Sequence, residues 1–159
     1  KPLKKNKKII SSTLIRKLLS RGKLNKANYL LNRNWSVEGI VLKGRMMGKK
    51  IGFPTANIKM DDYIIPRLGV YAVRVKLENR RRLLKGIANI GYRPTFNQKK
   101  ILLEINLFKF NKNIYNKKLT VEFLKFIRKE KKFNGINELR KQIKVDLTKV
   151  KNVKQVKYG

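Results

Sequence analysis

Thr55 and Asn57 are two side chains whose types and spacing suit a metal-bound phosphate. Residues two apart on an extended chain point to the same side, so the Thr55 hydroxyl and the Asn57 amide oxygen would share one face. Both are hard oxygen donors, and Mg²⁺ accepts such ligands together with nucleotide phosphates. The pair is therefore a candidate Mg²⁺ site.

The loop that leads into this pair is rich in glycine and lysine. Its glycines are Gly44, Gly48 and Gly52. Glycine lets a backbone approach a phosphate closely, and successive N–H groups can form an anion-binding concavity. Lys49 adds positive charge, and Pro54 stiffens the exit from the loop. The glycine spacing does not fit a Walker A loop, and an ordinary hairpin connection is the alternative interpretation.

Composition excludes several kinds of chemistry. The 159 residues include no cysteine and no histidine, which rules out disulfides, thiolate metal sites, His-based triads and His zinc sites. Only 9 residues are acidic, so any carboxylate catalyst comes from a short list. No apolar run is long enough to cross a bilayer and no secretory pattern opens the chain, so we expect a cytoplasmic protein without membrane contact.

The net charge of +33 is the most extreme bulk property. Such a charge could indicate nucleic-acid binding. The basic residues are spread along the whole chain among many Asn and Ile residues, so compositional drift in a genome poor in G and C is the favoured explanation. In either case the field attracts polyanions such as nucleotides, and we expect nucleic-acid binding only as non-specific electrostatic attraction.

Periodicity predicts helices at both ends of the chain and strands between them. Hydroxyl caps at 11–13 and a stop at Gly22 define a first helix, and a second covers 24–31. An apolar stripe predicts a helix from 136 to 149 that packs on the strands; the stripe is Ile136, Leu139, Ile143 and Leu147.

The region between these helices alternates apolar and polar residues with period two. The alternating stretches lie at 37–42, 69–75, 85–92, 101–110 and 118–126. Short strands at regular spacing, separated by turns, predict an antiparallel barrel or sandwich.

Several blocks of the sequence resemble, in order, the conserved motifs of riboflavin kinases. They are IGFPTANI at 51–58, GVYA at 69–72, ANIGYRPTF at 88–96, Leu103-Glu104, and FIRKEKKF at 126–133. The resemblance runs from about Trp35 to the C-terminus, and an ordered series is far more specific than one block. It implies a mainly β fold, a six-stranded antiparallel Greek-key-like barrel with a C-terminal helix.

The resemblance also implies a reaction and its residues. The γ-phosphoryl group of ATP would move to the ribityl 5′-hydroxyl of riboflavin, giving FMN and ADP, with Mg²⁺ as cofactor. Glu104 would be the catalytic base, its alternative being a solvent-facing strand residue. The ATP-binding residues would be Gly44, Gly48, Lys49, Gly52, Pro54, Thr55 and Asn57, of which Thr55 and Asn57 hold the metal. Arg128 and Phe133 would close over the flavin.

Two asparagines depart from the family pattern. Asn106 replaces a histidine two residues after Glu104, so a hydrogen-bonding role survives there and a titrating one does not. Asn116 replaces a glycine after Tyr115, and asparagine tolerates the left-handed conformation that this turn needs.

We expect two regions, a basic lead-in with a short helical segment at 1–34 and the kinase barrel with its C-terminal helix at 35–159. Residues 11–16 resemble the end of the adenylyltransferase domain of bacterial bifunctional riboflavin kinase/FMN adenylyltransferases. That domain needs a His-based phosphate motif, so FMN adenylylation by this chain is not expected, and a missing adenylyltransferase domain in a longer protein is a possible partner. The alternative function is a basic nucleic-acid-binding barrel or a decayed kinase.

Overall fold

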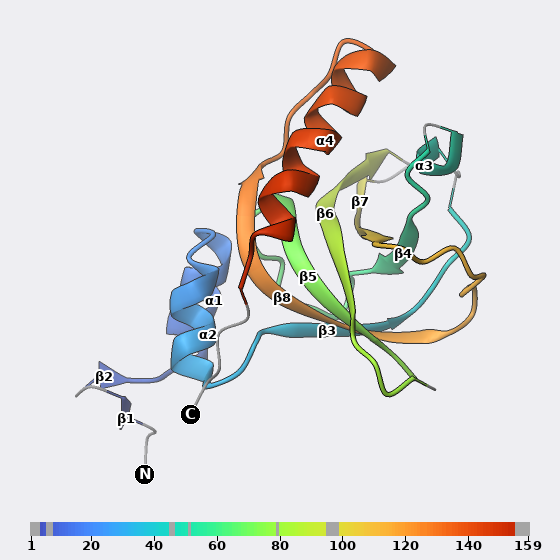
Figure 1. Cartoon of the computed structure of the whole chain (residues 1–159). Coiled ribbons are helices and arrows are strands. Elements are labelled where there is room, and N and C mark those ends of the chain that lie inside the picture. The colour runs from blue at the N-terminus through green and yellow to red at the C-terminus, as the bar shows by residue number, and fades with distance from the viewer. Residues whose placement is uncertain are drawn as a thin grey trace.

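Six antiparallel strands wrap into a nearly closed barrel, as the family resemblance predicted (Figure 1). This computed structural model describes residues 4–5, 8–44, 47–50, 52–78, 80–94 and 99–154. The barrel strands are β3 (Ser36–Ile40), β4 (Ala56–Lys59), β5 (Gly69–Leu77), β6 (Leu84–Pro94), β7 (Lys99–Leu107) and β8 (Lys118–Lys129). They follow the order β3-β8-β5-β6-β7-β4. A bridge between Leu42 and Asn57 joins the two ends of this order and so closes the barrel.

The barrel interior is filled by every second residue of its strands. In β7 these residues are Leu103, Ile105 and Leu107, and in β8 they are Leu119, Val121 and Phe123. Tyr71 of β5 packs edge-on against the Phe123 ring at 5.2 Å, and its hydroxyl donates a hydrogen bond to the Arg67 carbonyl. Burial raises the pKa of Tyr71. The predicted alternation is therefore confirmed, and the residues between these positions face outward.

Two helices precede the barrel, at α1 (Ser12–Ser20) and α2 (Leu24–Leu31), as predicted. The Ser11 side chain accepts a hydrogen bond from the Leu14 N–H at 3.1 Å, and Gly22 ends the first helix with a φ of 71°. The buried Asn28 side chain links α2 to the barrel, because it donates to the Phe123 carbonyl at 2.9 Å. The apolar side chains of both helices belong to the same cluster as the barrel core. Before them, β1 (Lys4–Lys5) and β2 (Lys8–Ile9) form a short ladder that was not predicted.

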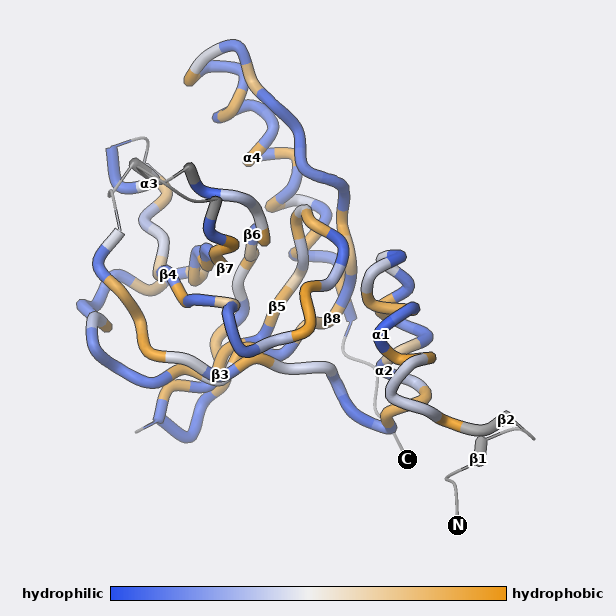
Figure 2. Tube along the Cα trace, turned by 180° about the vertical axis from the view of Figure 1, so that it is seen from behind, coloured by the Kyte–Doolittle hydropathy of each residue, from blue (hydrophilic) through white to orange (hydrophobic). Residues whose placement is uncertain are grey.

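The C-terminal helix α4 (Ile136–Lys151) lies against the outside of β5, β6 and β8 (Figure 1). Hydrophobic and hydrophilic residues alternate in short segments along it in Figure 2. The predicted contact stripe is only partly correct, since Ile136 is 55% exposed while Asp146 and Val150 are buried. Asp146 and Val150 continue the stripe of Leu139 and Ile143, and Asp146 pairs with Arg128 of β8. Ile136 is the first residue of α4, and the start of this helix projects beyond the barrel (Figure 1).

One short helix, α3 (Met47–Lys50), forms within the glycine-rich loop. It lies beside β4 and β7, away from α1 and α2 (Figure 1). Among the described residues, no helix combines the length and the apolar character needed to pass through a bilayer.

Candidate active site

Strand register brings three polar residues into one row on the outer face of the barrel. Asn57 of β4 lies opposite Glu104 of β7, and Glu104 lies opposite Asn89 of β6. The neighbours of Glu104 along β7, Leu103 and Ile105, are buried in the core, so the Glu104 carboxylate points outward. The fold therefore places the predicted base beside the predicted metal ligand Asn57, although 47 positions of sequence separate them.

Glu104 is paired with an arginine that the sequence analysis did not single out. Arg93 Nη2 forms an ion pair with Glu104 Oε1, and the two side chains are 37% and 18% exposed. Arg93 lies on β6, on the same face as Asn89 because the two are four residues apart. The only signal in the sequence was the position of Arg93 in the motif at 88–96, which does not reveal its partner. The carboxylate is therefore half-open to solvent and bound by one guanidinium.

Close backbone approach explains the glycines of the loop before β4. The Cα of Gly44 lies against the side-chain amide of Asn57, and a Cβ at Gly48 would be 3.3 Å from Thr55 Oγ1. The Gly48 carbonyl also accepts a hydrogen bond from the Phe53 N–H at 2.7 Å. Gly52 has a φ of 86°, which favours glycine. A side chain at Gly44 would collide with the Asn57 amide, and one at Gly48 would collide with the Phe53 carbonyl, so both positions require glycine.

Asn106 supports the same segment from β7. Its amide nitrogen donates a hydrogen bond to the Pro54 carbonyl at 2.8 Å. Asn116, the second departure from the family pattern, adopts a φ of 61° and donates its N–H to the Val41 carbonyl at 3.0 Å. Both asparagines therefore keep the local structure, as the sequence predicted.

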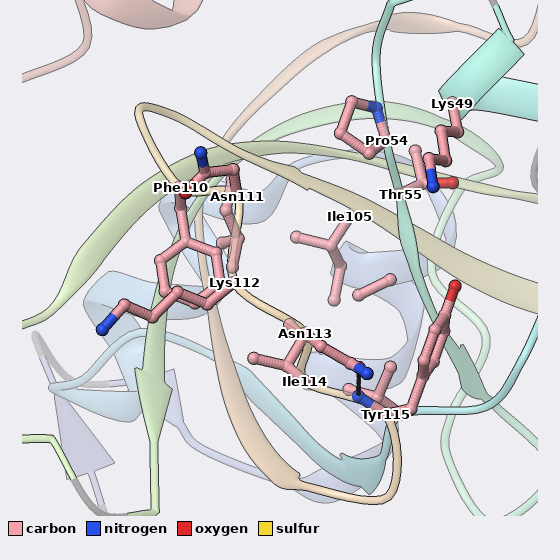
Figure 3. A pocket seen from close by; sticks show the side chains of 13 residues that line it. Lys49, Pro54, Thr55, Ile105, Phe110, Asn111, Lys112, Asn113, Ile114 and Tyr115 are labelled. Atoms are coloured by element: carbon pink, nitrogen blue, oxygen red, sulfur yellow. Dashed lines mark hydrogen bonds between the residues drawn. The ribbon is translucent and has the colours of Figure 1, made fainter.

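A pocket of about 380 Å³ lies between the loop before β4, the inward-facing residues of β4 and β7, and the turn at 110–115 (Figure 3). Its apolar wall consists of Val41, Ile105, Leu107, Phe110, Ile114 and Tyr115. Lys49, Pro54 and Thr55 lie together at one edge, while Phe110 and Tyr115 lie across the cavity from them (Figure 3). The turn at this wall is held by the Asn113 side chain, which accepts a hydrogen bond from the Tyr115 N–H at 3.0 Å. The pocket has no signal in the sequence, because its lining comes from separate segments that meet only in the folded barrel. These segments include 41, 54–56 and 105–115.

Arg128 and Phe133 lie close together, but the Arg128 guanidinium is bound to Asp146 of α4. Arg128 Nε lies 3.0 and 2.9 Å from the two carboxylate oxygens of Asp146, and Nη2 lies 2.8 Å from Oδ2. Gln142 also donates to Asp146, at 3.0 Å. The guanidinium lies 5.7 Å from the centre of the Phe133 ring. Arg128 thus ties the loop after β8 to the helix.

The side chains of this site suit a cation that also binds phosphates. Thr55 and Asn57 offer a hydroxyl and an amide oxygen, and Glu104 lies next to Asn57 in the sheet. In the part of the chain that the structure describes, no three His, Cys, Asp or Glu side chains gather into a metal cage. Mg²⁺ does not need one, because it is usually bound through one or two protein oxygens, water and substrate phosphates. The donor set therefore fits Mg²⁺.

Some residues of the predicted motifs lie outside the described part of the chain. They are residues 45, 46 and 51 in the glycine-rich loop and 95–98, which include the end of the motif at 88–96. All the predicted site residues themselves are described.

The chain matches known proteins over most of its length. A family model described as Flavokinase: Riboflavin kinase matches residues 31–154. A bifunctional riboflavin kinase/FMN adenylyltransferase from Bacillus subtilis (strain 168) is 44% identical over 143 residues, 87% of this chain and 45% of the relative. The enzyme of the same name from Buchnera aphidicola subsp. Schizaphis graminum is 43% identical over 151 residues, 94% of this chain and 48% of the relative. The chain thus spans a little under half the length of these relatives.

A solved structure has the same fold. It is described as a macrolide-efflux protein from Streptococcus pneumoniae and aligns with a TM-score of 0.85 at 34% identity, covering 95% of this chain and 49% of that one. Its described role in efflux belongs to that protein and differs from the kinase named by the family model and the sequence relatives. On the match over residues 31–154, this chain belongs to the riboflavin kinase family.

Proposed function

We propose that this chain transfers the γ-phosphoryl group of ATP to the 5′-hydroxyl of riboflavin, giving FMN and ADP. The observation that carries the proposal is the short segment 55–57. Thr55 lines the pocket, and Asn57 lies beside Glu104 on the outer face. The segment therefore connects a nucleotide-sized cavity to a carboxylate that can accept a proton.

Glu104 acts as the base in this proposal. The 5′-hydroxyl oxygen of riboflavin forms a bond to the γ-phosphorus while the bond from that phosphorus to the ADP oxygen breaks, and the hydroxyl proton passes to the Glu104 carboxylate. Phosphoryl transfer has a loose transition state, so the protein contributes mainly position and charge. A bound Mg²⁺, held by Thr55 and Asn57, would neutralise charge on the phosphates.

ATP enters the pocket with its base against the apolar wall. A cavity of about 380 Å³ is within the range of small-molecule sites, roughly 300 to 1,000 Å³. Phe110 and Tyr115 offer ring surfaces for the adenine, and Lys49 and Thr55 mark the edge where the phosphates lie. The glycines of the loop then allow its backbone N–H groups to approach those phosphates.

The flavin lies on the outer face, near the loop that follows β8. Phe133 is the aromatic side chain of that loop, and Arg128 holds it through the contact at 5.7 Å. Because the guanidinium of Arg128 is already bound by Asp146, its part in flavin binding is to orient the loop. The sequence predicted that Arg128 closes over the flavin, whereas the role proposed here is to position the loop that does so.

The origin of residues 1–34, the attraction of nucleic acid and the cellular location also stay proposals. We propose that residues 1–34 correspond to the end of an adenylyltransferase domain, which would act in the same longer protein. FMN adenylylation is not proposed for this chain. Non-specific attraction of nucleic acid follows from the charge of +33, and the cytoplasmic location stays a prediction.

A direct assay tests this function. Purified protein, riboflavin, ATP and Mg²⁺ should yield FMN and ADP in equal amounts, measured by chromatography. Chelation of divalent cations should stop the reaction, and Thr55→Ala should lower it by roughly 10- to 100-fold through loss of an oxygen ligand. A folded wild-type chain that produces no FMN would refute the proposal.

A further inference from the structure

A second carboxylate, Glu130, lies over the active-site face of β6. Its Oε1 occupies the space where a Cβ of Gly91 would be. Gly91 lies between Asn89 and Arg93 on the outer face of β6, and the amide nitrogen of Asn89 is 3.1 Å from the same point. The missing side chain of Gly91 therefore makes room for the Glu130 carboxylate.

This position places Glu130 near the Arg93–Glu104 ion pair. Arg93 must reach past Gly91 to contact Glu104, because Asn89, and not Arg93, lies opposite Glu104 in the sheet. Glu130 feels the charges of both, since Arg93 lowers its pKa and Glu104 raises it. Loss of hydration is the larger effect and, together with Glu104, leaves the pKa of Glu130 above its ordinary value. Two carboxylates therefore compete for one guanidinium.

The ion pair with Arg93 conflicts with the task of Glu104. A base must have a free lone pair directed at the substrate hydroxyl, within about 2.6 to 3.2 Å. One oxygen of Glu104 is occupied by Arg93 in the present structure, which leaves fewer lone pairs of the carboxylate to face a substrate hydroxyl. For Glu104 to accept the proton of the substrate hydroxyl, the Arg93 guanidinium has to bind to another group.

We propose that Glu130 is a positioning residue for the base, and that it takes Arg93 from Glu104 when the substrates bind. The exchange of Arg93 from one carboxylate to the other leaves Glu104 free to accept the hydroxyl proton. Arg93 stays paired in both arrangements, so the guanidinium is never left without a carboxylate. The proposal rests on the proposed kinase activity, because it assigns Glu104 as the base.

A double-mutant cycle tests the exchange. The proteins are wild type, Glu130→Gln, Arg93→Gln and the double variant, assayed for kcat with saturating riboflavin and MgATP. Glu130→Gln leaves Arg93 on Glu104, so kcat should fall roughly tenfold or more, as for groups coupled by about 1.4 kcal/mol. In the Arg93→Gln background, the same substitution should change kcat less than about twofold, since there is no guanidinium to hold.

A matched control separates this effect from a change of net charge. Glu78 is an exposed acidic residue directly after β5, outside the site, and Glu78→Gln removes the same charge. It should leave kcat unchanged. If Glu130→Gln lowers kcat by the same factor with and without Arg93, or does not lower it at all, the proposal is overturned.

A crystal structure of the Glu104→Gln variant tests the exchange without turnover. Loss of the charge at position 104 should move the Arg93 guanidinium to the Glu130 carboxylate. An Arg93 side chain that stays at position 104 or turns to solvent would overturn the proposal. If the wild type makes no FMN but Arg93 does move to Glu130 in this variant, the kinase proposal fails while the exchange of partners is upheld.

Discussion

Two of the arginine–carboxylate pairs on the outer face of this barrel differ in how deeply their carboxylates are buried. Strand register connects them in one row through Glu104, Asn89, Val70 and Arg128. Asp146 is 2% exposed under α4 and accepts hydrogen bonds from Arg128 and Gln142. Glu104 is 18% exposed, and its arginine is 37% exposed.

The difference separates a structural pair from the pair that contains the proposed base. A buried ion must have its hydrogen-bonding capacity satisfied, because an unpaired charge in the interior costs several kcal/mol. The Arg128–Asp146 pair meets that condition and fastens α4 to β8. The Arg93–Glu104 pair is more exposed, at 37% and 18%, so separating its members costs less. Both contain the same chemical groups, and burial decides what they do.

The largest effect should come from removing the carboxylate of the proposed base. We expect Glu104→Gln to lower kcat by about 10²- to 10⁴-fold, the usual contribution of a general base. The folded protein should melt at a temperature close to that of the wild type, because the pair is half-open. The measurement is FMN formation together with a thermal melt. An active Glu104→Gln protein would show that Glu104 is not the base.

The structural pair should show the opposite pattern. Asp146→Ala removes the buried partner of Arg128, whose own side chain is 19% exposed, so the free energy of unfolding should fall by about 1 to 3 kcal/mol. Denaturant titration measures this loss. Replacing both members, with Arg128→Met and Asp146→Leu, should recover most of the stability, since no buried charge remains. A double variant as unstable as Asp146→Ala would show that the pair is not the source of the loss.

Glu130 provides a smaller test that uses pH. Its folded pKa is raised above the ordinary 4.5, so the favourable contribution of the neutral form is complete below pH 4.5 and disappears as the pH rises through the folded value. Glu130→Gln is always neutral at this position. It should therefore be as stable as the wild type in acid and slightly more stable near neutral pH, as seen in thermal melts. A neutral-pH loss of stability would indicate that Glu130 serves the fold.

The smallest effect should come from a third pair, Glu38 and Lys118, which are 50% and 53% exposed. The hydrogen bond from Lys118, at a separation of 3.0 Å, lowers the pKa of Glu38. Its contribution is thus present above the ordinary pKa of 4.5 and lost as the pH falls. Glu38→Gln should lower the melting temperature only slightly near neutral pH, and not at all in acid or high salt. A larger fall in the melting temperature would show that this exposed pair stabilises the fold as the Arg128–Asp146 pair does.

Much of the fold was predictable because it follows from local patterns. The hydroxyl cap at Ser11, the stop at Gly22 and the helix over 24–31 were correct. The strand alternation was also correct, although β7 ends at Leu107 before the predicted 110 and β8 continues to Lys129. Each of these features depends on neighbours in the sequence.

The candidate site was only partly predictable. Thr55, Asn57 and Glu104 were found through motifs, and the register then placed Asn57 opposite Glu104. The pairing of Arg93, the position of Glu130 over Gly91 and the apolar pocket had no local signal. Each depends on which strands are neighbours.

The sequence by itself determined which strand residues face in and where the first two helices lie, and it predicted which side chains could carry phosphoryl transfer. It also predicted a contact stripe that included Ile136. Only the tertiary structure decided that Ile136 is exposed and that Asp146 is buried against Arg128. The physical reason is that side-chain period defines the faces of an element, whereas contacts with distant strands decide how far along the element that face is covered and by which partner.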